Sequence, residues 1–393
     1  MSTTSAGLHR NSSTARRSPK ASTNGMAGKR PLPGQVVLVL QGGGALGAYQ
    51  VGVYQALHEA GIEPAWVIGT SIGAINAALI SGNRPEQRME RLNAFWDEVE
   101  QRSPMDGLFS LLGLAGMSHM MNNANTVARG IPNFFTPNLA AMRGPQAEVG
   151  VESASYYSTK PLRETLRALV DFEYLCECHT RLTVGAVNAC SGHMRYFDSR
   201  KEPLTVDHVM ASGALPPAFG AIRIEGEPYW DGGIYSNTPI EAVLDDKPRR
   251  DSLIFAVNVW HQTGPEPESI SEVMSRMKDI QYASRADSHI ARQKQIHRLR
   301  HVIRELTKEI AATRQADPRV KELSSWGCGT TVHVAHLLAP RVEGEDQTKD
   351  IDFTTAGVHA RRAAGYADTM RMIERAPWTV AAADPIEGVI EHI

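Results

Sequence analysis

Two short apolar runs, each followed by a glycine-rich turn, constrain the fold of this chain most. Residues 35–40 read Gln-Val-Val-Leu-Val-Leu and lead into Gly42-Gly43-Gly44, while residues 65–68 lead into Gly69-Thr70-Ser71-Ile72-Gly73. Apolar, largely β-branched runs of this length are typical of strands buried on both faces. Helical spacing of apolar residues follows each run. The order strand, helix, strand, helix predicts an α/β fold in which a mostly parallel sheet lies between helices.

The same alternation continues along the chain. We expect further strands at 182–187, 194–197, 221–224, 229–230, 253–259 and 330–338, and helices at 45–60, 74–80, 85–100, 161–170, 205–212, 239–244 and 354–374. Apolar residues three or four apart within 269–313 predict one or two long helices. We therefore expect an α/β domain at 34–260, with a C-terminal helical extension at 261–393 packed on the same domain.

The N-terminal residues 1–33 differ from the rest in composition. They carry six basic residues and no acidic one, and they are rich in Ser, Thr and Gly. Such a segment cannot bury enough apolar surface to fold, so we expect a disordered basic tail, although the composition also fits an organellar transit peptide. The whole chain has a net charge of −2, which gives no general attraction to nucleic acid.

Cysteine content and hydropathy bear on the compartment. Four cysteines in 393 residues are too few for a disulfide scaffold, and their spacing matches neither a zinc site nor a redox pair. We therefore expect reduced thiols in the cytoplasm and no metal. No run reaches the ~20 apolar residues that span a bilayer, and the N-terminus lacks a secretory signal.

Ser71 is the first candidate for chemistry, because it occupies the centre of a Gly-x-Ser-x-Gly turn between a predicted strand and a predicted helix. A serine at such a turn is held out of the sheet with its hydroxyl exposed. The positive end of the following helix lies beside the hydroxyl oxygen. The alternative is a serine that only caps the helix.

A serine nucleophile needs a base and donors for the oxyanion. The backbone of Gly42, Gly43 and Gly44 can approach a ligand closely, and it follows the neighbouring strand, at the edge where parallel sheets bind ligands. Asp231, in Asp231-Gly232-Gly233, is the candidate base, because a carboxylate can take the Ser71 proton directly and later activate water. Asp-Gly-Gly alone more often marks a turn.

These motifs, in this order, resemble the patatin-like phospholipase family: GGGALG at 42–47, GTSIG at 69–73, ASGALPP at 211–217 and DGG at 231–233. The likeness covers about 36–259 and is closest to a bacterial subgroup with an added C-terminal region. It implies a three-layer patatin-like fold. It also implies hydrolysis of phospholipids or other acyl lipids by a Ser71–Asp231 dyad, with Gly42, Gly43 and Gly44 forming the oxyanion hole and no cofactor.

One position departs from the family pattern. Many members carry Arg or Lys two residues after the third glycine, where this chain has Leu46. A cation there stabilises negative charge near the site. Its replacement by leucine weakens the expectation that phosphate-bearing head groups are favoured.

Three other classes of protein share parts of the pattern. The string 42–47 also satisfies the G-x-G-x-x-G dinucleotide fingerprint, but the second strand does not end in the acid that holds a ribose. An α/β-hydrolase triad of Ser71, Asp231 and either His333 or His336 has the right chain order, but that fold places its elbow after several strands. A non-catalytic lipid-binding protein of the same fold is the third alternative.

Two segments suggest contact with lipid. Residues 107–128 carry no charged side chain and predict either a lid over the site or a buried loop. Residues 285–304 carry six cations, namely Arg285, Arg292, Lys294, Arg298, Arg300 and Arg304, against Asp287 alone. Such a basic helix fits peripheral binding to a membrane, a solvated face or a contact in a homo-oligomer.

Overall fold

The computed structural model describes residues 1, 32–101, 125–283, 286–342, 345–380, 384 and 386–393. The chain divides into two units, Met1–Pro31 and Leu32–Ile393. All the helices and strands given below belong to the second unit. The predicted tail at 1–33 and the uncharged segment at 107–128 lie mostly outside the described residues.

A nine-stranded sheet forms the centre of the second unit, in the order β11-β10-β9-β1-β2-β5-β8-β7, with β6 also paired to β5. The strands are β1 (Gln35–Leu40), β2 (Trp66–Gly69), β5 (Arg181–Asn188), β6 (Met194–Asp198), β7 (Ile222–Ile224), β8 (Glu227–Asp231), β9 (Ser252–Asn258), β10 (Val332–Leu338) and β11 (Val389–His392). The six strands from β11 to β5 are parallel, and the pairs of β5 with β6 and β8 and of β7 with β8 are antiparallel. A small hairpin joins β3 (Thr136–Pro137) and β4 (Tyr157–Ser158).

The central strand β1 shows why its sequence reads as one apolar run. Val36, Leu38 and Leu40 belong to one hydrophobic cluster, while Val37 and Val39 belong to a second. Because side chains alternate along a strand, the two clusters lie on opposite faces of the sheet. Both faces are therefore covered by helices, and the fold has the three layers that were predicted.

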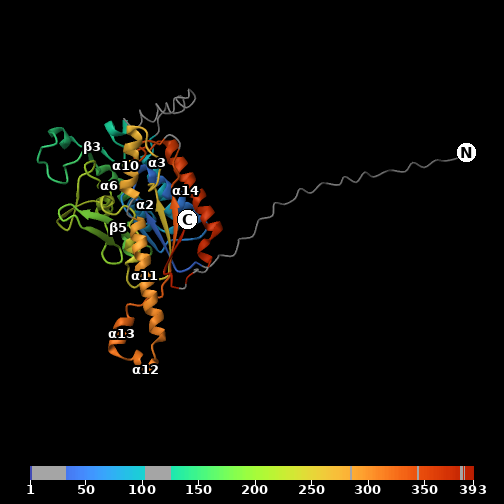
Figure 1. Cartoon of the computed structure of the whole chain (residues 1–393). Coiled ribbons are helices and arrows are strands. Elements are labelled where there is room, and N and C mark those ends of the chain that lie inside the picture. Colours follow the sequence, from blue (N-terminus) through green and yellow to red (C-terminus); the bar gives the residue numbers. More distant parts are fainter. Residues whose placement is uncertain (2–31, 102–124, 284–285, 343–344, 381–383, 385) are drawn as a thin grey trace. The chain divides into compact units, whose positions relative to one another are not determined.

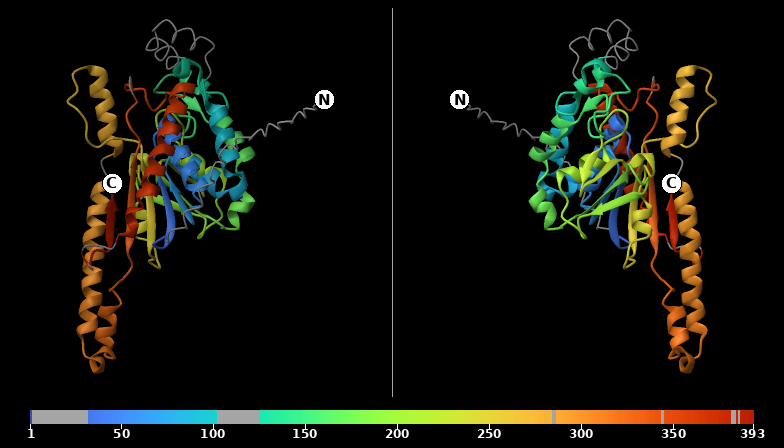
Figure 2. Two further views of the ribbon diagram at one scale, coloured as in Figure 1. Left: turned by 90° about the vertical axis from the view of Figure 1, so that its right-hand side faces the viewer. Right: turned by 90° about the vertical axis from the view of Figure 1, so that its left-hand side faces the viewer.

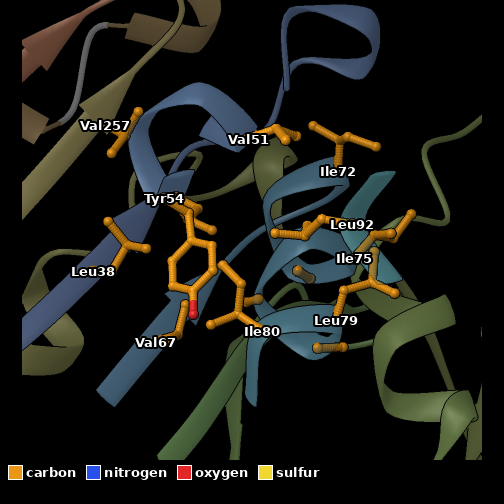
Figure 3. Packing of buried hydrophobic residues seen from close by; sticks show 14 of the residues in the cluster. Leu38, Val51, Tyr54, Val67, Ile72, Ile75, Leu79, Ile80, Leu92 and Val257 are labelled. Atoms are coloured by element: carbon orange, nitrogen blue, oxygen red, sulfur yellow. The ribbon is translucent and has the colours of Figure 1, made fainter. Parts of the chain in front are cut away.

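The first face is covered by the helices α1 (Ala48–Glu59), α2 (Ile72–Ser81), α3 (Pro85–Val99) and α14 (Thr355–Arg375). Figure 3 shows Leu38 of β1 and Val67 of β2 beside Tyr54 of α1 and Ile80 of α2. These four side chains are essentially inaccessible to solvent. The largest share of the apolar burial that stabilises the fold lies in this layer.

The opposite face is covered by α9 (Glu241–Leu244) and by α11 (Ala286–Glu309), whose Ile290 is buried in the second cluster. Beyond the sheet, α11 continues alongside α12 (Ala312–Gln315) and α13 (Pro318–Ser324) (Figures 1 and 2). The remaining helices are α6 (Lys160–Leu169), α7 (Phe172–Cys176), α8 (Val206–Ser212) and α10 (Ile270–Ala283).

The structure adds three strands that the sequence did not predict, namely β3 and β4 of the small hairpin and β11 at the edge of the sheet. Val389–His392 forms β11, which pairs in parallel with β10 at the edge of the sheet. The four residues read Val-Ile-Glu-His, two apolar and then two polar, which is too short a run and lacks the alternation that marks a strand. The C-terminal region thus supplies the two strands β10 and β11 to the sheet, in addition to its helices.

Helices α1 and α14 pack at very close range. A Cβ atom at Gly365 of α14 would lie 2.0 Å from the carbonyl oxygen of Tyr49 in α1. Such an approach is possible only where a residue has no side chain. Gly365 therefore sets the distance between the C-terminal helix and the first helix of the fold.

Replacing Gly365 with alanine should lower the free energy of unfolding by about 1–3 kcal/mol, because the added methyl group overpacks the α1–α14 contact. On an unpacked helix face the same change would raise stability by up to ~1 kcal/mol, so the sign is informative. Urea unfolding followed by circular dichroism measures the effect. Ala363→Gly, on the exposed side of α14, is the control and should cost about 1 kcal/mol. A stabilised Gly365→Ala protein would contradict the close packing.

Candidate active site

Two loops meet at one edge of the sheet because β1 and β2 are adjacent and parallel. Their register pairs Leu40 with Gly69, the last residues of the two strands. The glycine loop after β1 and the serine turn after β2 therefore emerge side by side. This is the carboxyl edge, where open α/β sheets bind ligands.

Ser71 has a strained backbone, with φ 56° and ψ −127°. Residues with a side chain rarely adopt a positive φ, and the strain must be balanced by the surroundings. The Ser71 N–H donates to the Ser212 carbonyl oxygen at 3.0 Å and lies 3.2 Å from the Ser212 hydroxyl. At Gly73 a Cβ would lie 2.3 Å from the Leu40 carbonyl oxygen, so the turn requires glycine there. Helix α2 begins at Ile72, directly after Ser71, and directs its positive end at the turn.

The peptide group that joins Gly42 and Gly43 is held firmly. The Gly42 carbonyl oxygen accepts from Trp260 Nε1 at 2.7 Å and from Asn237 Nδ2 at 3.0 Å. The Gly42 N–H in turn donates to the Asn237 carbonyl oxygen at 3.2 Å. Because a trans peptide is planar, fixing this carbonyl also fixes the Gly43 N–H, which points the opposite way. Within the described residues, the N–H groups of Gly43 and Gly44 have no hydrogen-bond partner.

Gln41 connects the glycine loop to three later segments. Its side chain is 1% exposed and donates to Thr238 Oγ1 at 2.7 Å and to the Tyr282 carbonyl oxygen at 3.2 Å. Its Oε1 accepts from the N–H groups of Val259 and Trp260 at 2.6 and 3.0 Å. A buried amide with this many partners is a rigid support, because losing any one leaves a buried polar group unpaired.

Asp231 is the last residue of β8, and 1% of it is exposed. Its Oδ1 accepts from the Gly233 N–H at 2.7 Å, and its own N–H donates to the Ala214 carbonyl oxygen at 3.0 Å. Burial raises the pKa of its carboxyl group to about 7, while hydrogen bonds from the Ser71 side chain and the Gly233 N–H oppose the rise. Desolvation dominates because the charged form loses its water.

Ser71, Asp231 and Gly42–Gly44 all line one cavity of about 250 Å³. Most of its wall is apolar and aromatic, and Phe134, Phe135, Phe219 and Phe353 contact one another there. Among its described lining residues, the carboxylates of Asp231 and Asp350 are the charged groups. Nowhere in the described ranges do three or more His, Cys, Asp or Glu side chains gather as metal ligands would.

The structure thus brings together all five residues selected from the sequence. It also adds supports that carry no sequence signal of their own, namely Gln41, Asn237, Trp260 and Tyr282. Two residues of the 211–217 stretch also support the site. The carbonyl oxygen of Ala214 accepts from the Asp231 N–H, and that of Ser212 accepts from the Ser71 N–H. His333 and His336 lie on β10 and do not line the cavity. Instead His333 contacts His392, and His336 pairs with Glu391.

The comparison with family models decides the class of protein. A model described as patatin-like phospholipase matches residues 38–244, just over half of the chain. The chain belongs to the patatin-like phospholipase family. A second model, described as patatin phospholipase, matches residues 280–384 and so covers much of the region after β9.

Curated relatives of this patatin-like protein match over short stretches. Lysophospholipase nte1 of Aspergillus terreus is 64% identical over 44 residues, 11% of this chain and 3% of that protein. Triacylglycerol lipase ptl3 of Schizosaccharomyces pombe is 39% identical over 62 residues, 16% of this chain and 13% of that protein. Human patatin-like phospholipase domain-containing protein 6 is 43% identical over 61 residues, which are 16% of this chain and 4% of that protein. This chain therefore spans only a small part of these relatives.

Two bacterial proteins of known structure are similar at low level. VipD from Legionella pneumophila is 16% identical, with a TM-score of 0.39 over 87% of this chain and 67% of that one. ExoU from Pseudomonas aeruginosa, solved with SpcU, is 16% identical, with a TM-score of 0.29 over 91% of this chain and 73% of that one. Scores this low carry no argument about the site.

The buried Asp231 carboxylate should make this patatin-like protein less stable as pH rises. The unfolded chain releases this proton near its usual pKa of 3.8, whereas the folded protein holds it until about pH 7. Asp231→Asn should therefore gain stability over wild type between pH 4 and 7, and the gain should level off above pH 7. At 1.36 kcal/mol per pKa unit, the gain is at most about 4 kcal/mol. Urea unfolding at pH 5 and pH 8 measures it, and an equal difference at both values would contradict the raised pKa.

Proposed function

We propose that this chain is a serine acyl-hydrolase that cleaves carboxylic esters of phospholipids or other acyl lipids. Ser71 is the nucleophile and Asp231 its general base. Membership of the patatin-like phospholipase family supports the reaction class. The observation that carries the proposal is that Ser71 and the buried Asp231 carboxylate line the same cavity, where burial raises the pKa of that carboxyl group to about 7. A base poised near neutral pH is suited to take a proton from a hydroxyl group.

The reaction runs in two steps through an ester on Ser71. Ser71 Oγ attacks the carbonyl carbon of the substrate while its proton passes to Asp231. The resulting tetrahedral intermediate collapses, and the leaving alcohol takes the proton from Asp231. Water then attacks the acyl group on Ser71, again losing a proton to Asp231. Collapse of the second intermediate returns that proton to Ser71 Oγ and releases the fatty acid.

The backbone N–H groups of Gly43 and Gly44 are the proposed donors to the oxyanion. Both residues line the cavity, and both N–H groups are free of other partners in the described structure. The N–H of Gly42, in contrast, is already bonded to Asn237, so Gly42 contributes by its shape and by its fixed carbonyl group. Donors fixed before reaction stabilise developing charge without reorganisation.

The cavity wall supports an acyl chain as the part of the substrate that is bound inside. Its surface is largely aromatic and aliphatic, which suits a hydrocarbon chain. The described part of the wall includes no lysine or arginine, and Leu46 is itself buried. A phosphate head group would meet Asp231 and Asp350 without a cation, so we place the head group outside the cavity. This chemistry requires no metal or cofactor.

The alternatives are weaker on the same observations. A Ser–Asp–His triad requires His333 or His336 beside Asp231, but both side chains have partners on β11. A dinucleotide would require an acid for its ribose at the end of β2, where the chain continues Gly69-Thr70-Ser71. A lipid-binding protein without activity would not need Ser71, the buried Asp231 carboxylate and the glycine loop at the wall of one cavity.

Labelling with a fluorophosphonate tests the nucleophile directly. Wild type should be labelled, Ser71→Ala should not react at all, and Asp231→Asn should react about 10²–10⁴ times more slowly, because its base is lost. Gel fluorescence against time gives the rates. His333→Gln with His336→Gln is the matched control and should react like wild type. If the folded wild type is not labelled, with or without lipid vesicles, the chain is a lipid-binding protein instead.

The labelling rate should also report the titration of Asp231. Only the ionised carboxylate accepts the Ser71 proton, so the rate should rise between pH 5 and 8 with an apparent pKa near 7 and then level off. Because the relevant group is an acid with a raised pKa, acidification should inhibit the enzyme well above pH 4. A rate that is flat across this range would exclude Asp231 as the base.

A further inference from the structure

Helix α10 (Ile270–Ala283) has the opposite polarity to an ordinary surface helix. Apolar residues three or four apart normally form the face that packs on the core. Here that row points into solvent, and it will be called the α10 stripe. Its five members and their exposed fractions are Ile270 (82%), Val273 (52%), Met274 (45%), Met277 (57%) and Ile280 (49%).

The charged side chains of α10 face the body of the protein instead. Lys278 Nζ contacts Asp350 Oδ1 at 2.7 Å and the Gln347 carbonyl oxygen at 2.8 Å. Asp279, which is 3% exposed, pairs with Lys349 at 2.7 Å. The helix is thus fastened through its polar face, and the position of the α10 stripe in solvent follows from specific ion pairs.

Arg276 is the remaining cation of α10, and it is also turned inward. Its guanidinium donates to the carbonyl oxygens of His261 and Gln262. Glu272 accepts from the N–H groups of Glu268 and Ser269 at the start of the helix. The outward face is therefore an apolar surface without a free cation among its described residues.

The same helix forms part of the candidate active site. Tyr282, in its last turn, lines the cavity, and its carbonyl oxygen accepts from Gln41 and Asn237. Asp350, the partner of Lys278, also lines the cavity, and its carbonyl oxygen accepts from the Ala45 N–H at 2.9 Å. Figures 1 and 2 draw α10 at the same end of the unit as the segment that begins at residue 125. That segment includes Val127, which lines the cavity and is 56% exposed.

We propose that the α10 stripe docks on the surface of neutral or zwitterionic lipid beside the mouth of the cavity. The proposal rests on the proposed function, because an enzyme whose cavity holds an acyl chain must meet its substrate at an aggregated lipid surface. The α10 stripe lies on the same helix as Tyr282, which lines the cavity, and its five members carry no cation for anionic head groups. Five exposed apolar side chains on one helix are also far fewer than the roughly 20–30 residues that each partner contributes to a standard protein interface.

Because the cations of α10 face the protein, the proposed docking differs from electrostatic binding to anionic lipid. The basic run predicted on α11 is partly neutralised, because Lys294 pairs with Glu387 and Glu391, and Arg298 pairs with Asp384. Docking through the α10 stripe should therefore tolerate salt, since burial of apolar surface is not screened.

Vesicle flotation with the Ser71→Ala protein tests docking without hydrolysis. This protein should float with phosphatidylcholine vesicles equally well at 0.1 and 0.5 M NaCl. Adding Met274→Glu and Met277→Glu should reduce the bound fraction at least tenfold, and the milder pair Met274→Ser and Met277→Ser should reduce it less. Leu306→Glu, an exposed apolar position on α11 (61%), is the matched control and should bind like its parent.

Three outcomes would overturn the proposal. The first is unchanged flotation of both methionine pairs. The second is binding that requires anionic lipid and falls with salt, which would assign the contact to the basic face of α11. The third is a lipid-free dimer, seen by light scattering, that the methionine pairs dissociate. Fluorophosphonate labelling of the same variants with Ser71 intact separates the two proposals: normal flotation without labelling would remove the hydrolase and leave docking in place.

Discussion

The parallel pairing of β1 with β2 is the constraint on which the site depends. Its register ends both strands at the same level, Leu40 beside Gly69, so that two loops of very different sequence open side by side. A shift of one residue would turn the apolar side chains of β1 toward the wrong cluster. The burial of both faces of the sheet therefore fixes the distance between the glycine loop and Ser71. The geometry needed for chemistry is a by-product of how the core packs.

The site also stores unfavourable free energy that the rest of the fold offsets. Ser71 has a backbone conformation that residues with side chains avoid, and Asp231 is a carboxylate with 1% exposure. Each feature lowers stability and each is suited to a nucleophile and a base. Hydrogen bonds made by Gln41, Asn237 and Ser212 restrain the segments around these groups so that they do not relax. The proposed activity and the stability of the fold are thus opposed at these two residues.

The sequence predicted the elements whose patterns are strong and local. Buried strands such as 35–40, and the elbow around Ser71, were found within one or two residues of their ends. The three-layer arrangement was predicted from the same alternation and is confirmed. What could not be predicted depends on contacts between distant residues: Asn237 and Trp260 show no pattern, yet they hold Gly42. The polarity of α10 belongs to this class too, because its row of apolar residues alone indicates a buried face.

The sequence analysis missed the outer strand β11 for another reason. It is short, it lies at the edge, and its pairing with β10 is decided by the sheet that is already there. Local preference is weak in such a segment, and tertiary context determines its structure. The structure gives the positions of the five predicted site residues at the cavity wall. Their chemical roles stay predictions.

The carbonyl of Asp350 bonded to Ala45 has a consequence for how the protein is made. The ribosome delivers the glycine loop and Ser71 early, but Tyr282 and Asp350 follow more than 200 residues later. Strand β1 must also wait for β9, and β9 for β10, before its edges are filled. Contacts of such high sequence separation form slowly, and the exposed strands are prone to aggregate meanwhile. Ser71 therefore stays in an incomplete pocket until at least Asp350 has been synthesised, so the proposed hydrolase would gain its activity late in synthesis.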